Sequence, residues 1–517
     1  MKQHTRIAII CNKSDIDTIP LQLLLSELNS HSYISDLFSV DNNHKKLTSR
    51  QKTFSRLIKL FYCLEYAFNL LTNRYIPRSQ LRLLFGKTSK KVPRVFARFP
   101  ELALSIKDSE CTFIIDLINS KIDFGLPKIS ISYDFEFSKI GFNEVILHLE
   151  QIRVILFYNP LNKIGFTDFR KECNFLNRKG LFRSHYFSSK LLSAYIVYSI
   201  ENPFHSALPN SVEPQFELTI DFTHFTKYIY SLFVDFLSLF YRKKGSDWHL
   251  AFYPNNWLSR LDSEITVLQN PSNSFLADPF LFEIENELYC FAELFDFSTS
   301  KGRIVSAKVD QFSTNWSWKD EITENFHLSF PFIFKYQDDF YMCPETSEIQ
   351  EIRIYKYDKK TLKWNYYKTL MNNVRAADTL IFFKNGKWWL FCTLDLAQIN
   401  EYETFAFLWY SDNPFTSHWV PHNLNPVFID SNKARNAGLL YDKDEIYRVS
   451  QSQGQYTYGK SFDIHRIKII NEMEFTEVRL KDQICRLQEN IEATHHFSSF
   501  GNFSIQDVIA MSYKEQL

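Results

Sequence analysis

The sequence predicts a multidomain α/β plus all-β protein: a Rossmann-like α/β domain with a helical C-terminal extension over residues 1–245, then a five-bladed β-propeller over residues 246–517. Three observations lead to this prediction. The chain of 517 residues is too long for one ordinary core. Its first half alternates strand-like and helix-like segments, and its second half holds short strands in a pattern that repeats about every 50 residues. Such a repeat is typical of a β-propeller.

The first 245 residues show the alternation that a mainly parallel sheet requires. We expect helices over residues 21–30 and 188–200, and strands over residues 6–11, 34–40, 112–117, 128–133 and 152–158. Two aromatic-rich segments, 53–71 and 226–244, are predicted to be amphipathic helices. The apolar part of the second is about 16 residues long, shorter than the ~20 of a spanning helix. Both segments either pack against the protein or lie on a membrane surface.

A 16-residue hairpin pattern recurs four times in the second half. Each copy holds two apolar strands around a two-residue turn, of which Asn385-Gly386 is the strongest turn signal. Two further strands follow each copy, which completes four four-stranded blades. The copies cover residues 278–293, 330–345, 378–393 and 436–451.

A fifth blade is predicted from both ends of this region. Residues 495–512 supply an inner hairpin, and residues 248–253 and 264–270 supply the outer strands. Sharing a blade between the two ends closes the ring and removes an open sheet edge.

The hairpin ends are the candidate site. A two-residue turn brings the first and last residues of a copy together, and the inner strands of a propeller line its central channel. One mouth of the channel therefore gathers acidic and polar side chains: Asp278, Glu293, Glu345, Asp378, Asn436 and Gln451, with His327 and Arg435 close by. Crowded carboxylates push one pKa upward, which suits acid–base chemistry on glycosidic bonds. The alternative is structural, because Asp278-Pro279 also suits a turn and polar strand ends cap exposed backbone.

Composition excludes several classes of function. The formal net charge of zero argues against a nucleic-acid partner. The eight cysteines lack ligand spacing, and His495-His496 reads as a core or rim pair, so we expect no metal and no cofactor. The N-terminus lacks a signal-peptide pattern, which predicts a cytoplasmic location. The basic end of segment 226–244 (Arg242 to Lys244) suits anionic headgroups, so peripheral contact with an inner membrane is the alternative to packing against the protein.

Six ordered motifs carry a resemblance to a known family. They are ADPF (277–280), HLSFPF (327–332), PETSE (344–348), AADT (376–379), ARNAG (434–438) and QSQGQYTYG (451–459). They resemble the propeller at the N-terminus of plant glucosamine inositolphosphorylceramide transferases and in bacterial proteins of surface-polysaccharide loci. That propeller is similar to the five-bladed fold of family 43 and family 32/68 glycoside hydrolases.

The resemblance implies roles for residues of the mouth. By position Asp278 would be the base, and Glu345 and Asp378 are the candidates for the acid and for the residue that tunes its pKa. The ring itself offers Glu293 as the alternative acid. Substrate contacts would come from His327, Arg435, Asn436, Gln451, Gln453 and Tyr458. The characteristic acid motif of the hydrolases is absent from this sequence.

The N-terminal domain is similar in outline to methionyl-tRNA formyltransferase-type domains, through residues 129–134 and 141–156. The catalytic His of that family would fall near Tyr133, and no Asn-His-Asp set is visible. The resemblance therefore implies a degenerate domain with a structural or substrate-presenting role.

These observations favour a carbohydrate-active protein of surface-polysaccharide or glycolipid biosynthesis. Its mouth would bind a sugar, a nucleotide-sugar or a lipid-linked glycan, and transfer or cleave it. Two alternatives stay open: a non-catalytic glycan-binding or scaffold module that docks a partner glycan-biosynthesis enzyme, and a formyl or acyl transferase that acts through the N-terminal domain.

Overall fold

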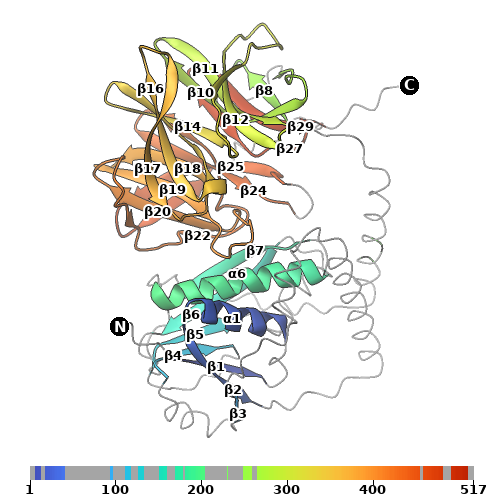
Figure 1. The fold of residues 1–517 in the computed structure, drawn as a ribbon, viewed down its shortest axis with the longest axis vertical. Helices are drawn as coiled ribbons and strands as arrows, with labels where there is room; N and C mark the ends of the chain where they lie inside the picture. The colour runs from blue at the N-terminus through green and yellow to red at the C-terminus, as the bar shows by residue number, and fades with distance from the viewer. Residues whose placement is uncertain are drawn as a thin grey trace. The chain divides into compact units, whose positions relative to one another are not determined.

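The computed structural model describes two compact units, Met1–Arg242 and Lys243–Leu517, which are considered separately (Figure 1). The described residues are 6–12, 18–40, 94–96, 111–117, 126–132, 151–159, 169–178, 181–203, 227, 230, 248–258, 265–454, 458–480 and 491–510. The predicted helix over 53–71, nearly all of 226–244, Tyr133 and most of 141–156 lie outside them.

The N-terminal unit holds a seven-stranded mixed sheet of order β3-β2-β1-β4-β5-β6-β7. Strands β1 to β5 run parallel, and β6 and β7 are antiparallel additions at one edge. The strands are β1 (Arg6–Asn12), β2 (Ile34–Val40), β3 (Arg94–Phe96), β4 (Phe113–Asp116), β5 (Lys128–Ser132), β6 (Gln151–Asn159) and β7 (Phe169–Leu176). The expected strand positions agree with these, and a Rossmann-like or formyltransferase-like character stays a prediction.

Two helices of this unit pack against each other, α1 (Ile19–Ser30) and α6 (Leu181–Glu201). Pro20 lies in the first turn of α1, where N–H groups have no partner within the helix, so the missing N–H of proline costs no helical hydrogen bond. Lys190 of α6 pairs with Glu27 of α1 at 2.5 Å. The central strand β1 is buried on both faces, since Ile7 to Ile10 have no exposed surface, as expected in a parallel sheet.

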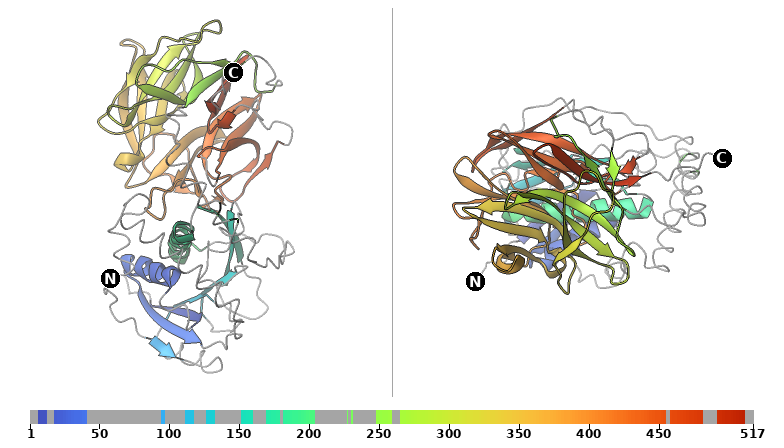
Figure 2. Two further views of the ribbon diagram at one scale, coloured as in Figure 1. Left: turned by 90° about the vertical axis from the view of Figure 1, so that its right-hand side faces the viewer. Right: turned by 90° about the horizontal axis from the view of Figure 1, so that it is seen from above.

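The C-terminal unit is the predicted five-bladed propeller (Figures 1 and 2). Blade 1 is β10 (Ser274–Ile284), β11 (Glu287–Asp296), β12 (Lys301–Lys308) and β13 (Lys319–Ile322). Blade 2 is β14 (Ser329–Tyr336), β15 (Asp339–Glu345), β16 (Glu351–Asp358) and β17 (Lys363–Asn372). Blade 3 is β18 (Ala376–Lys384), β19 (Lys387–Leu394), β20 (Phe405–Ser411) and β21 (Val420–Pro421), with β22 (Phe428–Ile429) also on β20. Blade 4 is β23 (Asn436–Asp442), β24 (Glu445–Ser452), β25 (Ser461–Ile470) and β26 (Phe475–Arg479).

Blade 5 closes the ring with strands from both ends of the unit, as predicted. It joins β27 (Ile491–Ala493), β28 (Phe497–Phe500) and β29 (Phe503–Ala510) to β8 (His249–Tyr253) and β9 (Thr266–Val267). Phe252 of β8 pairs with Ile505 of β29, and Figure 2 shows green and red strands side by side. This pairing leaves no open edge between the first and last blades.

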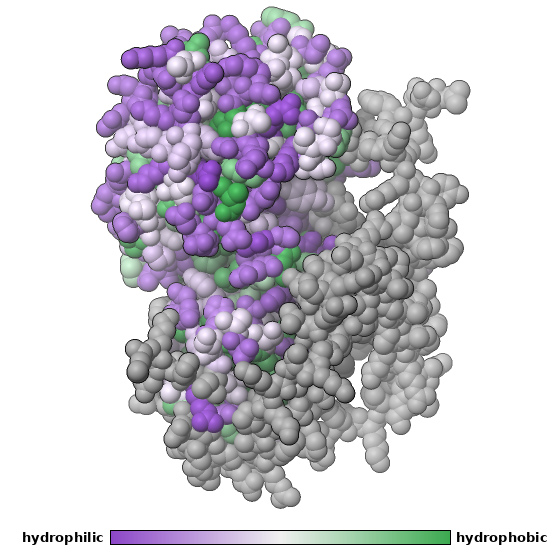
Figure 3. Space-filling view, viewed as in Figure 1, coloured by the Kyte–Doolittle hydropathy of each residue, from purple (hydrophilic) through white to green (hydrophobic). Residues whose placement is uncertain are grey.

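The surface of the propeller that Figure 3 shows is mostly hydrophilic, with hydrophobic residues in small, separate spots. Spots of that size are ordinary on a folded domain. Within the described part of the chain, no helix is long and apolar enough to cross a membrane.

Candidate functional site: a ring of acidic side chains

Four inner strands carry a β-bulge at the candidate site: β23 between Asn436 and Gly438, and β10, β14 and β18 at a residue other than glycine. The bulge residues Asp278, Phe330 and Asp378 have φ of 49°, 46° and 51°, a left-handed conformation that is uncommon outside glycine. Because of the bulges, the residues directly opposite are Ala277↔Glu293, Ser329↔Glu345 and Ala377↔Thr393. The expected pairing of the first and last residues of each hairpin is therefore shifted by one residue. The left-handed backbone of these non-glycine residues is strained, and such strain is typical of functional positions.

Asp278 is buried and held from several sides. Its Oδ2 accepts a hydrogen bond from the backbone N–H of Phe330 at 3.1 Å, and its Oδ1 lies 3.1 Å from Nε2 of His495. Burial raises the pKa of Asp278, but the His495 hydrogen bond and the charges of His495, His496 and Arg435 outweigh it and lower the pKa to about 2. Asp278 is therefore an ionised carboxylate at neutral pH.

Asp507 and His495, which the sequence reasoning did not select, complete a chain of charged groups with Asp278. Asp507 Oδ1 accepts the backbone N–H groups of His495 and His496, both at 2.9 Å, and Oδ2 accepts the N–H of Asp278 at 3.1 Å. Nδ1 of His495 lies 3.1 Å from Asp507 Oδ2. Burial lowers the pKa of His495, but Asp507 and Asp278 outweigh it and raise the pKa. Burial raises the pKa of Asp507 to about 6.

The surroundings of Glu293 disfavour its anionic form. Burial, followed by the charges of Asp278, Glu345, Asp507 and Asp378, raises its pKa well above the usual range. Its Oε1 lies 3.5 Å from Nε2 of His327. Nδ1 of His327 accepts the backbone N–H of Gly302 at 2.9 Å, so a neutral His327 carries its proton on Nε2, facing Glu293.

Arg435 is the guanidinium of the ring. Its Nε lies 2.5 Å from Asp378 Oδ2, and one terminal nitrogen lies 3.8 Å from Glu345 Oε2. Burial raises the pKa of Asp378 to about 7, with Glu345 and Asp278 adding to the rise and Arg435 opposing it. Glu345 Oε1 accepts from Ser347 at 2.6 Å, and its buried Oε2 has no hydrogen-bond partner among the described residues. That oxygen is an acceptor left for a ligand.

The side-chain amides that were predicted to contact substrate form hydrogen bonds within the protein. Asn436 donates to the carbonyl groups of Asp378 and Phe391, and Gln451 donates to Asp378 Oδ2 and to the carbonyl of Asn436. Gln453 donates to Gln451 and accepts the N–H of Gly459. Tyr458 differs, since it is 44% exposed with its ring 5.4 Å from the Arg435 guanidinium carbon. A substrate-binding role for these residues stays a prediction.

A metal site at the ring is possible by distance alone. Three possible metal ligands lie within 4.8 Å of one another, one atom each from Asp278, His495 and Asp507. Both nitrogens of His495 already face carboxylates, so a metal would have to displace one of these ion pairs. The neighbouring His496 is fully buried against Phe280 and Phe330, and burial lowers its pKa to about 3, which keeps it neutral.

Comparison with known proteins places this ring in a family. A glucosamine inositolphosphorylceramide transferase 1 protein of Oryza sativa subsp. japonica is 34% identical over 213 residues, 40% of this chain and 28% of that protein. The Arabidopsis thaliana protein of the same name is 34% identical over 215 residues, covering 41% and 28%. The chain thus spans less than a third of the length of these relatives.

A catalytic domain of a Coprinopsis cinerea GH62 α-L-arabinofuranosidase is similar with a TM-score of 0.36 at 10% identity, over 51% of this chain and 98% of that domain. The family model "Glucosamine inositolphosphorylceramide transferase 1, N-terminal" matches residues 247–506, which include every acidic residue of the ring except Asp507. The chain therefore belongs to the family of the N-terminal region of glucosamine inositolphosphorylceramide transferase 1.

Proposed function

We propose that the propeller mouth binds a sugar residue of a glycolipid head group and performs acid–base chemistry on its glycosidic bond. The observation that carries the proposal is the opposite protonation preference of two carboxyl groups in one ring: Asp278 is held ionised by His495, and Glu293 is held protonated by burial among other carboxylates. Two titratable groups whose environments push their pKa values apart are the usual arrangement for a base and an acid.

The chemistry divides between these two residues. Glu293 would donate its proton to the leaving glycosidic oxygen as the bond to the anomeric carbon breaks. Asp278 would accept the proton of the incoming water or hydroxyl group, which forms the new bond, and proton exchange through solvent would restore both groups. Glu345, whose Oε2 lies 3.8 Å from Arg435 and accepts no hydrogen bond among the described residues, would position a sugar hydroxyl.

The charge of the ring favours a sugar that carries a positive group. With Glu293 protonated and His496 neutral, four acidic side chains (Asp278, Glu345, Asp378 and Asp507) face one guanidinium and the imidazole of His495 among the described residues. An ammonium group would relieve this excess, and the relatives are named for glucosamine inositolphosphorylceramide. An amino sugar on an inositol phosphate head group is therefore the ligand class we propose.

A non-catalytic glycan-binding module is the second candidate. Both oxygens of Asp278 already have partners, Phe330 and His495, an arrangement that also suits a fixed binding surface. We further propose a cytoplasmic location at the surface of a membrane, and a structural or substrate-presenting role for the formyltransferase-like N-terminal unit.

The test uses the full chain and a glucosaminyl inositol phosphate. Calorimetry would compare the parent with Asp278→Asn and Glu345→Gln, and turnover would be followed on p-nitrophenyl glycosides. Loss of turnover and weaker binding in both variants is expected. Binding unchanged in both variants, together with no turnover by the parent, would contradict the proposal.

A further inference from the structure

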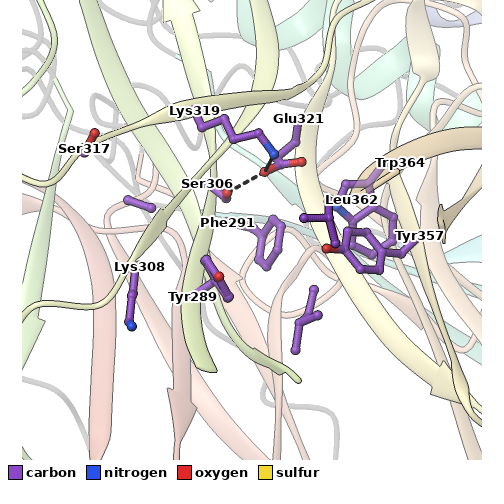
Figure 4. Close-up of a pocket in the computed structure, with 12 residues that line it drawn as sticks. Tyr289, Phe291, Ser306, Lys308, Ser317, Lys319, Glu321, Tyr357, Leu362 and Trp364 are labelled. Atoms are coloured by element: carbon purple, nitrogen blue, oxygen red, sulfur yellow. Dashed lines mark hydrogen bonds and ion pairs between the residues drawn. The ribbon is translucent and has the colours of Figure 1, made fainter. Parts of the chain in front are cut away.

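A second cleft lies between blades 1 and 2 of the propeller (Figure 4). Its volume is about 280 Å³, near the lower end of the range for small-molecule pockets, ~300–1,000 Å³. One wall comes from β11, β12 and β13 and carries Tyr289, Ser306 and Glu321, and the other comes from β16 and β17 and carries Tyr357 and Trp364.

This cleft is separate from the acidic ring. Tyr289 lies four residues before Glu293 on β11 and pairs with Phe282, close to the hairpin turn. At about 3.3 Å per residue, four residues separate the two backbone positions by roughly 13 Å. Phe291, which also lines the cleft, is nearer to Glu293, two residues or roughly 7 Å along the strand. None of the acidic residues of the ring lines the cleft.

Aromatic rings form much of the cleft. The Trp364 ring lies 5.3 Å from that of Tyr357 and 6.0 Å from that of Phe291, centroid to centroid, the latter pair edge to face. Figure 4 shows Trp364 and Tyr357 side by side, with Phe291 and Tyr289 across from them. Such surfaces suit the C–H faces of a flat, partly apolar ring.

Two residues that line the cleft, Trp364 and Glu321, have hydrogen-bonding capacity left for a ligand. Trp364 is 6% exposed, and its buried indole N–H has no acceptor within the described part of the chain. An unpaired buried donor is destabilising, so a ligand acceptor there would be favourable. The Oε1 of Glu321 accepts from Ser306 at 2.8 Å and from Lys319 at 3.2 Å, and both bonds leave Oε2 for a further donor.

We propose that this cleft binds a single pyranose residue of a glycan, at a second site independent of the acidic ring. A sugar hydroxyl is both a donor and an acceptor, so adjacent hydroxyls can accept from the Trp364 indole and donate to Glu321. The aromatic rings of Tyr357 and Tyr289 contact the C–H face. The second site would hold a longer glycan or a neighbouring chain on the propeller while the ring acts elsewhere.

The test follows the indole N–H resonances of the full chain, labelled at tryptophan, during titration with cellobiose and with chitobiose. The Trp364 resonance, assigned by its loss in Trp364→Phe, is expected to shift with at least one disaccharide. The Glu321→Gln variant, which keeps the cleft shape, is expected to bind about tenfold more weakly, as for the loss of one charge-assisted hydrogen bond. Asp278→Asn should leave the shift unchanged.

Trp419 supplies a matched control. It is 8% exposed, its indole N–H likewise has no partner among the residues that the structure describes, and it does not line the cleft. Its resonance should stay still, and Trp419→Phe should bind as the parent does. A Trp364 resonance unmoved by both disaccharides, or unchanged affinity in Glu321→Gln, would overturn the proposal. So would a shift that disappears in Asp278→Asn, because the ligand would then belong to the ring.

Discussion

The imidazole of His495 lies between two carboxylates, with Nε2 3.1 Å from Asp278 Oδ1 and Nδ1 3.1 Å from Asp507 Oδ2. Asp507 also accepts the backbone N–H of Asp278, so it fixes both the imidazole and the strained bulge residue. Blade 5, which closes the propeller, thereby holds the ionised carboxylate of blade 1. The closing blade of the propeller therefore also supplies the residues that organise the site.

Replacing His495 with Gln removes the charge that keeps Asp278 ionised. His495 supplies the largest of the effects that lower the Asp278 pKa from its burial-raised value to about 2. Without it, burial dominates and the pKa should rise by at least one unit. Carboxyl ¹³C NMR titration of Asp278 in the parent and in His495→Gln measures this. An unchanged Asp278 pKa in His495→Gln would refute the role given to His495.

Asp507→Asn should change how stability depends on pH. The pKa of Asp507 is about 6 in the folded protein, above the ~3.9 of an unfolded chain. The folded state therefore binds this proton more tightly than the unfolded chain does. Protonation of Asp507 contributes about 3 kcal/mol to the free energy of unfolding below pH 4, and this contribution is lost as pH rises through 6.

Asparagine does not titrate. The fall in unfolding free energy between pH 4 and pH 7 should therefore be about 3 kcal/mol smaller in Asp507→Asn than in the parent. Urea unfolding at several pH values gives the comparison. An identical slope in parent and variant would show that Asp507 does not bind the proton.

Gly302→Ala should disturb Glu293 directly. A Cβ at this position would lie 2.5 Å from Glu293 Oε1 and too close to the carbonyl oxygen of Leu328. We expect a loss of about 1–3 kcal/mol in unfolding free energy, as for overpacking in a core. Gly501→Ala is the control, because its Cβ meets nothing within 4 Å and only its φ of +57° is unfavourable. Equal losses in the two variants, by chemical denaturation, would argue against close packing at Gly302.

Arg435→Gln should leave Asp378 buried without its guanidinium partner. Removing one partner of a buried ion pair destabilises by about 3–5 kcal/mol, since the other charge stays desolvated. The Asp378 pKa, about 7 in the parent, should rise further because Arg435 is the group that lowers it. Thermal unfolding together with NMR titration tests both effects. A variant as stable as the parent would mean that the pair contributes nothing.

The propeller could be predicted from the hairpins because their alternation and turn residues act locally, and Asn385-Gly386 carries its own turn preference. The bulges at Asp278 and Asp378 could not be predicted, because these residues adopt a left-handed backbone conformation at positions where no glycine indicates it. His495 and Asp507 were missed for a different reason. They lie in the closing blade, where the repeat is weakest, and their contact with Asp278 depends on pairing between distant ends of the unit.

The central claim is that one carboxyl group of the ring is charged and another is neutral. The most direct measurement compares Glu293→Gln with Asp278→Asn for binding of glucosaminyl inositol phosphate by calorimetry and for turnover on p-nitrophenyl glycosides. Gln is a neutral, similarly shaped replacement for a protonated Glu, so Glu293→Gln should bind within about twofold of the parent and lose turnover. Asp278→Asn removes a charge and should weaken binding at least tenfold, a loss of about 1.4 kcal/mol. Equal binding by both variants, or weakened binding by Glu293→Gln alone, would contradict the account.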